Sequence, residues 1–153
     1  MKIQFGDAQL VSANAVKADI VPNDEENKTT EVNSTDTQTD EYFSSTRLER
    51  ETMYSQMLET YQKMVDSNEI TNDQKAIAIQ EINNITNLKN AIMIAENLIK
   101  NKNFEDVVIL VSNNNASVIV KCNSLNADQI AQIQNIVCRE LNLKTENINI
   151  SKK

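Results

Sequence analysis

The chain has 153 residues, with no His, one Gly, two Cys and a formal net charge of −7. Residues 1–46 contain nine acidic side chains and three lysines and carry −6 of that charge, so the remainder of the chain is close to neutral. Lys and Arg are scattered singly, whereas nucleic-acid-binding and polybasic membrane-binding proteins need clustered positive charge. Charge therefore argues against both of these protein classes.

The N-terminal part is also the polar part of the chain. Two Val and one Pro are the only interruptions in residues 21–40, which are otherwise Asn, Asp, Glu, Gln, Lys, Ser and Thr. Such a stretch buries too little apolar surface to offset the entropy of ordering it. We therefore expect residues 1–44 to form a flexible acidic tether and residues 45–153 to form one compact domain. The alternative is that a strand or two within residues 8–21 docks on the domain.

Two helices are predicted at the start of the domain. In residues 45–66, apolar side chains recur at helical spacing, and Glu49 and Arg50 are expected on the opposite, solvated side. Ser44 or Ser45 is expected to cap this helix. Its apolar lines are Met53, Met57, Tyr61 and Met64, and beside them Tyr54, Leu58, Tyr61 and Val65.

The second helix is expected to begin at Thr71 or Asn72, either of which can accept hydrogen bonds from the first amides. Its apolar stripe runs from Ala78 to Ile99. Asn101 and Asn103 are suitable stops, because Asn tolerates the left-handed conformation with which many helices end.

A β-hairpin is predicted next, with strands at residues 106–111 and 117–122 joined by a turn rich in Asn. A helix capped by Asn126 follows, and residues 146–150 alternate polar and apolar as a half-buried strand does. The fold class is therefore α+β: two helices and then a ββαβ unit, with a three-stranded sheet and the helices packed on one face.

Few residues are candidates for chemistry. Cys122 and Cys138 can form a disulfide in an exported domain, but two small buried hydrophobic side chains are the commoner interpretation. Two Cys without a His do not form a structural zinc site. No Gly-rich phosphate loop and no nucleophile–base pair can be assembled. We therefore predict that the protein is not an enzyme and that it has no catalytic, cofactor-binding or metal-binding residues.

Two segments carry a resemblance to a known family. They are Arg47-Leu-Glu-Arg-Glu51 and the run from Ala95 to Val137, which contains the Phe104-Glu-Asp-Val-Val108 junction. Over about residues 47–150 the chain resembles stage III sporulation protein AH. Many members of that family have Gly where this chain has Asn103. They also have an N-terminal membrane span that this chain does not show, so we expect the chain to be an extracytoplasmic portion.

The resemblance implies a structural, protein-binding role in sporulation. The family is similar to the ring-building domains of flagellar and type III secretion basal bodies. Its members sit in the mother-cell membrane, with the domain facing the intermembrane space around the forespore. There they bind stage II sporulation protein Q, forming a channel or zipper between the two cells. The resemblance also implies a homo-oligomer or a hetero-oligomeric ring.

The predicted partner-binding surfaces are the hairpin strands and the Tyr-bearing face of the first helix. A free strand edge can take up a strand of a partner through main-chain hydrogen bonds. The residues expected to contact the partner are Tyr54, Tyr61, Val107, Ile109, Val111, Ile119 and Lys121.

Two alternative functions are disfavoured. A KH-like nucleic-acid-binding module needs a Gly-rich loop between helices, and the sole Gly is Gly6, in the predicted tether. A small thiol-dependent enzyme using Cys122 and Cys138 would lack both a C-x-x-C motif and a base to activate a thiolate.

Overall fold

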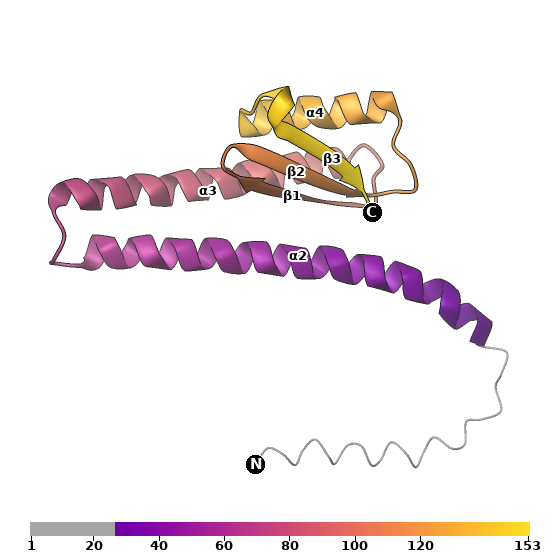
Figure 1. Cartoon of the computed structure of the whole chain (residues 1–153), viewed down its shortest axis with the longest axis horizontal. Coiled ribbons are helices and arrows are strands. Elements are labelled where there is room, and N and C mark those ends of the chain that lie inside the picture. Colours follow the sequence, from indigo (N-terminus) through magenta and orange to yellow (C-terminus); the bar gives the residue numbers. More distant parts are fainter. Residues whose placement is uncertain (1–26) are drawn as a thin grey trace, which may run out of the picture. The chain divides into compact units, whose positions relative to one another are not determined.

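The computed structural model describes the backbone of residues 27–153 and the side chains of residues 35–153. The chain divides into two compact units, Met1–Gln38 and Thr39–Lys153, and the second contains the sheet. Most of the predicted tether, including the alternative strands within residues 8–21, lies outside the described residues. The elements (Figure 1) are α2 (Asn27–Asp66), α3 (Asn72–Lys100), β1 (Asp106–Ser112), β2 (Asn115–Lys121), α4 (Ala127–Leu141), the 3-10 helix η1 (Thr145–Asn147) and β3 (Ile148–Lys152).

The strands form one three-stranded sheet in the order β1-β2-β3. β1 and β2 are antiparallel, whereas β2 and β3 are parallel with α4 as the connection between them. Asn113 and Asn114 have φ angles of 51° and 65°, which are typical of a two-residue type I′ hairpin turn. The predicted α+β class and the order helix, helix, ββαβ are confirmed.

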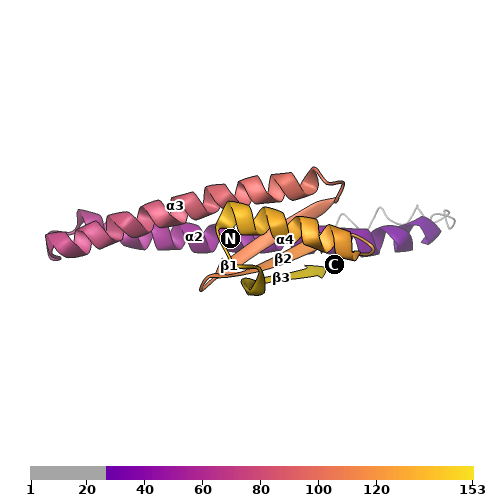
Figure 2. The ribbon, with the colours of Figure 1, turned by 90° about the horizontal axis from the view of Figure 1, so that it is seen from above.

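The main core lies between one face of the sheet and the helices α3 and α4, which run side by side over it (Figure 2). Because successive side chains of a strand point to opposite faces, alternate residues of β1 and β2 reach this core. Its central side chains are Ile85, Ile92 and Ile99 of α3, Val107 and Ile109 of β1, Val118 and Val120 of β2, and Ile133 and Val137 of α4.

The helix predicted to begin at residue 45 begins at Asn27 instead. Ser45 is therefore no cap; its Oγ donates to the carbonyl of Tyr42 within the helix. Phe43, which the sequence interpretation placed in the tether, is fully buried. Tertiary packing of one face stabilises a helix more than intrinsic propensity does, and the buried Phe43 and Thr46 provide such packing from residue 43 onward. The packed unit accordingly begins at Thr39.

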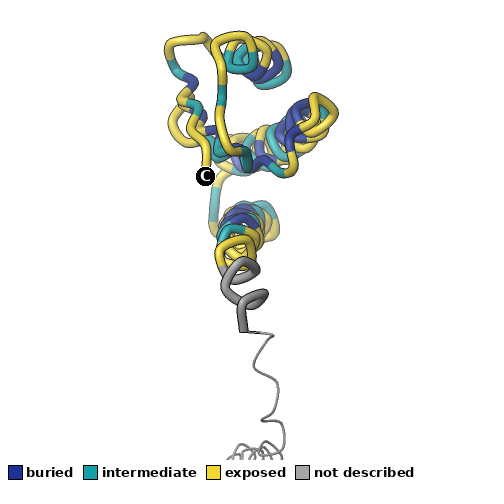
Figure 3. The backbone as a smooth tube through the Cα atoms, turned by 90° about the vertical axis from the view of Figure 1, so that its right-hand side faces the viewer, coloured by how far each residue is buried: buried dark blue, intermediate teal, exposed yellow. Residues whose placement is uncertain are grey.

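α2 contacts the sheet from a different side than α3 and α4 do. The Lys121 Nζ lies 2.8 Å from Oδ1 of Asp40 on α2. Lys121 neighbours the core residue Val120 on β2, so its side chain is on the opposite face. Figures 1 and 3 show α2 below the strands and α4 above them. The expectation of helices on one face thus holds for α3 and α4, with α2 as the exception.

The helix ends follow the residues that the sequence indicated. Thr71 caps α3 and Asn126 caps α4, each in a reciprocal capping box with a Gln three residues later. Of the two residues predicted for the helix stop, Asn103 has a φ of 72°, whereas Asn101 has a φ of −69° and is not left-handed. In the part of the chain that the structure describes, no helix is long and apolar enough to cross a membrane.

Candidate functional site

The outer edge of β1 is covered by side chains instead of by another strand. The hairpin turn makes Ser112 and Asn115 a hydrogen-bonded pair, so the main-chain groups of Val107, Ile109 and Val111 point away from β2. Both main-chain groups of Val107 are satisfied, one locally and one from α2. The Val107 N–H donates to Oδ1 of Asp106 at 2.9 Å, and its carbonyl accepts from Nη2 of Arg47 at 3.0 Å. Arg47 also pairs with Asp106.

A buried ion pair covers the next position along this edge. Arg50 Nη1 lies 2.6 Å from Oε2 of Glu96 and donates to the carbonyl of Ile109 at 2.9 Å. The Ile109 N–H donates to the same Glu96 oxygen at 2.8 Å. Only 8% of the Arg50 side chain is exposed, which corrects the expectation that Arg50 is solvated. The signal that was missed is spacing, because Arg50 lies one helical turn before the predicted apolar residue Tyr54.

The opposite edge of the sheet, on β3, has no such cover among the described residues. The Lys153 N–H donates to the carbonyl of Val120 at 2.9 Å, and Val120 is paired with Lys152 in the register. By the alternation along a strand, the main-chain groups of Ile150 and Lys152 then point outward. Lys152 is exposed and Ile150 is half-buried.

The structure places the predicted partner-binding residues in three environments. The side chains of Tyr54, Val107 and Ile109 are buried in the core, although Tyr54 also lines a hollow at its border. Tyr61 and Val111 are half-buried at the border of that core. The third environment is the far face of β2, which carries the remaining two residues, Ile119 and Lys121.

Lys121 is held in an acidic surrounding. Its Nζ lies 2.8 Å from the Asp40 carboxylate and 3.4 Å from that of Glu105. The hydrogen bond to Asp40 raises the pKa of Lys121 above its ordinary value; burial opposes this shift, and the interaction with Glu105 adds to it. Lys121 is thus engaged within the module.

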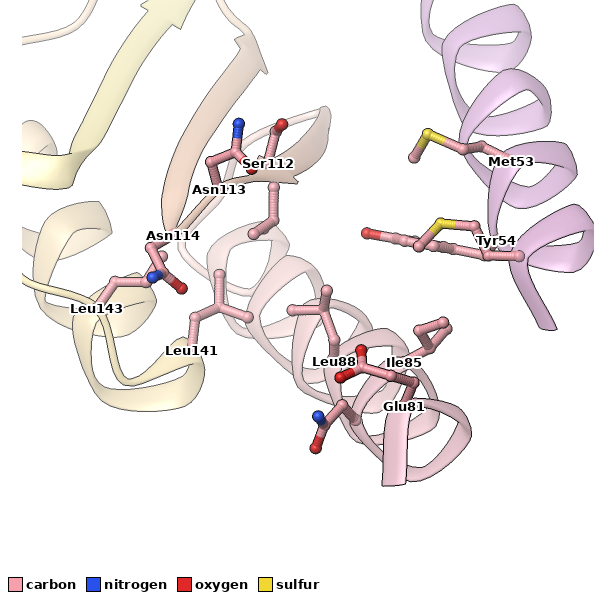
Figure 4. Close-up of a pocket in the computed structure, with 13 residues that line it drawn as sticks. Met53, Tyr54, Glu81, Ile85, Leu88, Ser112, Asn113, Asn114, Leu141 and Leu143 are labelled. Atoms are coloured by element: carbon pink, nitrogen blue, oxygen red, sulfur yellow. The ribbon is translucent and has the colours of Figure 1, made fainter. Parts of the chain in front are cut away.

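A hollow of about 430 Å³ opens between α2, α3, the hairpin turn and the residues after α4 (Figure 4). The hydroxyl of Tyr54 is buried here and has no hydrogen-bond partner among the described residues, and burial raises the pKa of this group above its ordinary value. The lining residues are Met53, Tyr54, Met57, Glu81, Asn84, Ile85, Leu88, Val111, Ser112, Asn113, Asn114, Leu141 and Leu143.

The thiols do not form a reactive site. Cys122 and Cys138 are both free and half-buried. Burial raises the pKa of Cys122, and Cys138 Sγ lies 3.5 Å from Oγ1 of Thr145. In residues 35–153, no group of His, Cys, Asp and Glu side chains is arranged to hold a metal ion. The geometry of the described residues therefore offers strand edges and an apolar hollow for binding.

Comparisons with known proteins find one family and one solved structure that resemble this chain. The model of a family described as SpoIIIAH-like protein matches residues 4–150. A chain in a structure described as "Structure of the SpoIIQ-SpoIIIAH pore forming complex" is 19% identical, with a TM-score of 0.67. The match covers 73% of this chain and 96% of that chain, and at this identity it shows a shared fold. Comparison with curated proteins gives no match.

Proposed function

This chain belongs to the SpoIIIAH-like family, and we propose that it is the extracytoplasmic docking module of a sporulation membrane protein. The proposed partner is a SpoIIQ-type protein, because a chain with this fold occurs in a SpoIIQ–SpoIIIAH complex. In this proposal the protein belongs to the mother-cell membrane, and the module faces the space around the forespore. The acidic N-terminal residues act as a spacer, and the docked pair forms part of a channel or zipper between the two cells.

The observation that carries the proposal is the difference between the two sheet edges. The β1 edge is covered at Val107 and Ile109 by side chains of Arg47, Arg50 and Glu96. The β3 edge carries no comparable cover within the described residues. An open edge pairs readily with an extended segment of another chain, which supplies affinity through main-chain hydrogen bonds. We therefore place the partner on the β3 edge.

A binding experiment with paired variants tests this proposal. The chain is mixed with the ectodomain of a SpoIIQ-type protein, and complex size is followed by light scattering after size exclusion. Lys152→Pro removes an outward N–H without breaking a bond to β2, whereas Lys152→Ala removes only the exposed charge. Because one lost main-chain hydrogen bond costs about 1.4 kcal/mol, Lys152→Pro should weaken binding about tenfold. Lys152→Ala should bind nearly as the unmodified chain does.

Four outcomes are informative. Absence of a complex would overturn the docking function, and equal binding by Lys152→Pro would overturn the β3 edge as the contact. A one-to-one complex would support a zipper that fastens two membranes, whereas large closed assemblies would support a channel.

A further inference from the structure

The hollow beside Tyr54 continues along the end of β1. A neighbouring hollow of about 260 Å³ shares Met53, Tyr54, Val111 and Ser112 with the larger one. Together they form a groove between α2 and the last residues of β1, entirely within the unit Thr39–Lys153. The groove begins where the cover over the β1 edge ends, at the Arg50 contact with Ile109.

Val111 contributes an unused main-chain position to this groove. Along the β1 edge, Val107 and Ile109 have partners for both their N–H and C=O groups. Val111 is the next residue with the same outward orientation, and no described residue covers its N–H or C=O. A donor and an acceptor side by side on a strand edge match the main chain of another extended peptide.

Tyr54 supplies a second polar group that has no partner. Its side chain is only 3% exposed, and the hydroxyl makes no hydrogen bond in the described structure. Figure 4 shows this hydroxyl pointing into the hollow. Leaving a buried hydroxyl without a partner costs free energy, so a ligand that bonds to it gains affinity.

The walls and the rim define what kind of peptide fits. Leu88 and Leu141 belong to the apolar wall, and the exposed Met53 and Met57 form an adaptable flank. The charged groups lining the groove, apart from the Arg50 that Glu96 already neutralises, are carboxylates of Glu49 and Glu81. An apolar side chain therefore fits the hollow, and basic residues fit next to it.

We propose that this groove is a peptide-binding site, separate from the β3 edge, for an extended segment of another protein. A bulky aliphatic side chain fills the hollow, its main chain pairs with Val111, and a main-chain carbonyl accepts from the Tyr54 hydroxyl. Lys or Arg residues flank the aliphatic side chain and face Glu49 and Glu81.

A peptide titration followed by NMR tests the site on the whole chain. The probe is acetyl-Lys-Val-Leu-Val-Lys-amide, and the signals are the ε-methyl groups of Met53 and Met57 and the amide of Val111. We expect saturable shifts of these methyl groups, with a dissociation constant of about 1 mM, and slower exchange of the Val111 amide. A matched peptide with Gly in place of Leu should bind about tenfold more weakly, because it loses the buried side chain.

Tyr54→Phe is the matched protein variant, since it removes only the unpaired hydroxyl. It should bind the probe about threefold to tenfold more weakly, while the midpoint of urea unfolding stays the same or rises. The absence of saturable shifts up to about 10 mM probe would overturn the proposal, as would equal binding of the Gly peptide. Concentration-dependent shifts of Met53 and Met57 without peptide would also overturn it, by assigning the groove to a second copy of the chain.

Discussion

The Nη1 atom of Arg50 on α2 lies 2.6 Å from Oε2 of Glu96 on α3, and both side chains are buried against the edge of β1. The pair also bonds both main-chain groups of Ile109, at 2.9 Å for the carbonyl and 2.8 Å for the N–H. Two helices thereby satisfy a strand position that would otherwise be open to another chain. This contact makes α2 part of the folded module.

Breaking this pair on one side should destabilise the module strongly. Arg50→Met or Glu96→Met leaves a buried charge without its partner, and each should lower the free energy of unfolding by about 3–5 kcal/mol. The double variant should lose less free energy of unfolding than the two single variants together, because no isolated buried charge remains. Urea unfolding of the four proteins measures these differences.

An exposed ion pair provides the control. The Nε atom of Arg139 lies 3.1 Å from Oε2 of Glu140, and the Arg139 side chain is 63% exposed. Arg139→Met should change the free energy of unfolding by less than about 1 kcal/mol. If Arg50→Met lowered the free energy of unfolding as little as Arg139→Met does, the buried pair would not stabilise the module as described.

Phe43 tests where the folded module begins. Its side chain is fully buried, so Phe43→Ala should lower the free energy of unfolding by about 3–5 kcal/mol through the cavity that it leaves. The exposed neighbour Ser44 is the control, and Ser44→Ala should stay within about 0.5 kcal/mol of the unmodified protein. Thermal or urea unfolding measures both. An unchanged stability of Phe43→Ala would mean that residues before 45 are dispensable, as the tether interpretation held.

Asn103 tests the left-handed position after α3. With a φ of 72°, Asn103→Gly should stabilise the protein by up to about 1 kcal/mol, because Gly adopts this conformation without steric cost. Asn103→Ala should destabilise it by about 1 kcal/mol. Asn101, at φ −69°, is the control, and Asn101→Ala should carry no such penalty. At position 103 the unfolding midpoint should be highest with Gly, intermediate with Asn and lowest with Ala. The reverse order would be inconsistent with the left-handed backbone at this position.

Cys122 should react slowly with alkylating reagents near neutral pH. Burial raises the pKa of this thiol above 9.0, although Lys152 and the Ser124 amide oppose the shift. The thiolate is the reactive form, so in a Cys138→Ser background iodoacetamide at about pH 8 should modify the folded chain more slowly than the urea-unfolded chain.

The raised pKa of Cys122 also determines how the stability of the folded chain changes with pH. Because the folded-state pKa lies above the unfolded value, the contribution of Cys122 is fully present below about pH 9 and is lost as the pH rises through the folded-state value. Equal alkylation rates of the folded and unfolded chains would show that the thiol is not shielded.

Local signals accounted for most of the elements. The spacing of apolar residues in α3 and α4 and the caps Thr71 and Asn126 depend on near neighbours in the sequence, and these predictions are confirmed. The strand predicted over residues 146–150 lies at Ile148–Lys152 instead, because Thr145–Asn147 form a 3-10 helix. With a single Gly in the chain, Asn occupies the left-handed positions of the described residues, at Asn103, Asn113, Asn114 and Asn142. Their turn chemistry is visible in sequence because Asn favours this conformation.

The contacts between distant residues could not be predicted in the same way. The spacing of Arg50 before Tyr54 indicates its side of α2, but its partner Glu96 is 46 positions away, and the sequence does not show that the two side chains meet. The burial of Phe43 likewise depends on contacts with residues distant in the sequence. The hairpin strands were predicted to offer an edge. Only three-dimensional packing shows that β1 is covered at Ile109, whereas no described residue covers Val111 or the β3 edge.

The most direct test of the account is amide hydrogen exchange of the full chain, alone and with a SpoIIQ-type ectodomain. If the partner pairs with the β3 edge, exchange of the Ile150 and Lys152 amides should slow by about tenfold or more, whereas that of Ile109, already bonded to Glu96, should not change. A complex that forms while the exchange of Ile150 and Lys152 stays the same would contradict docking through β3.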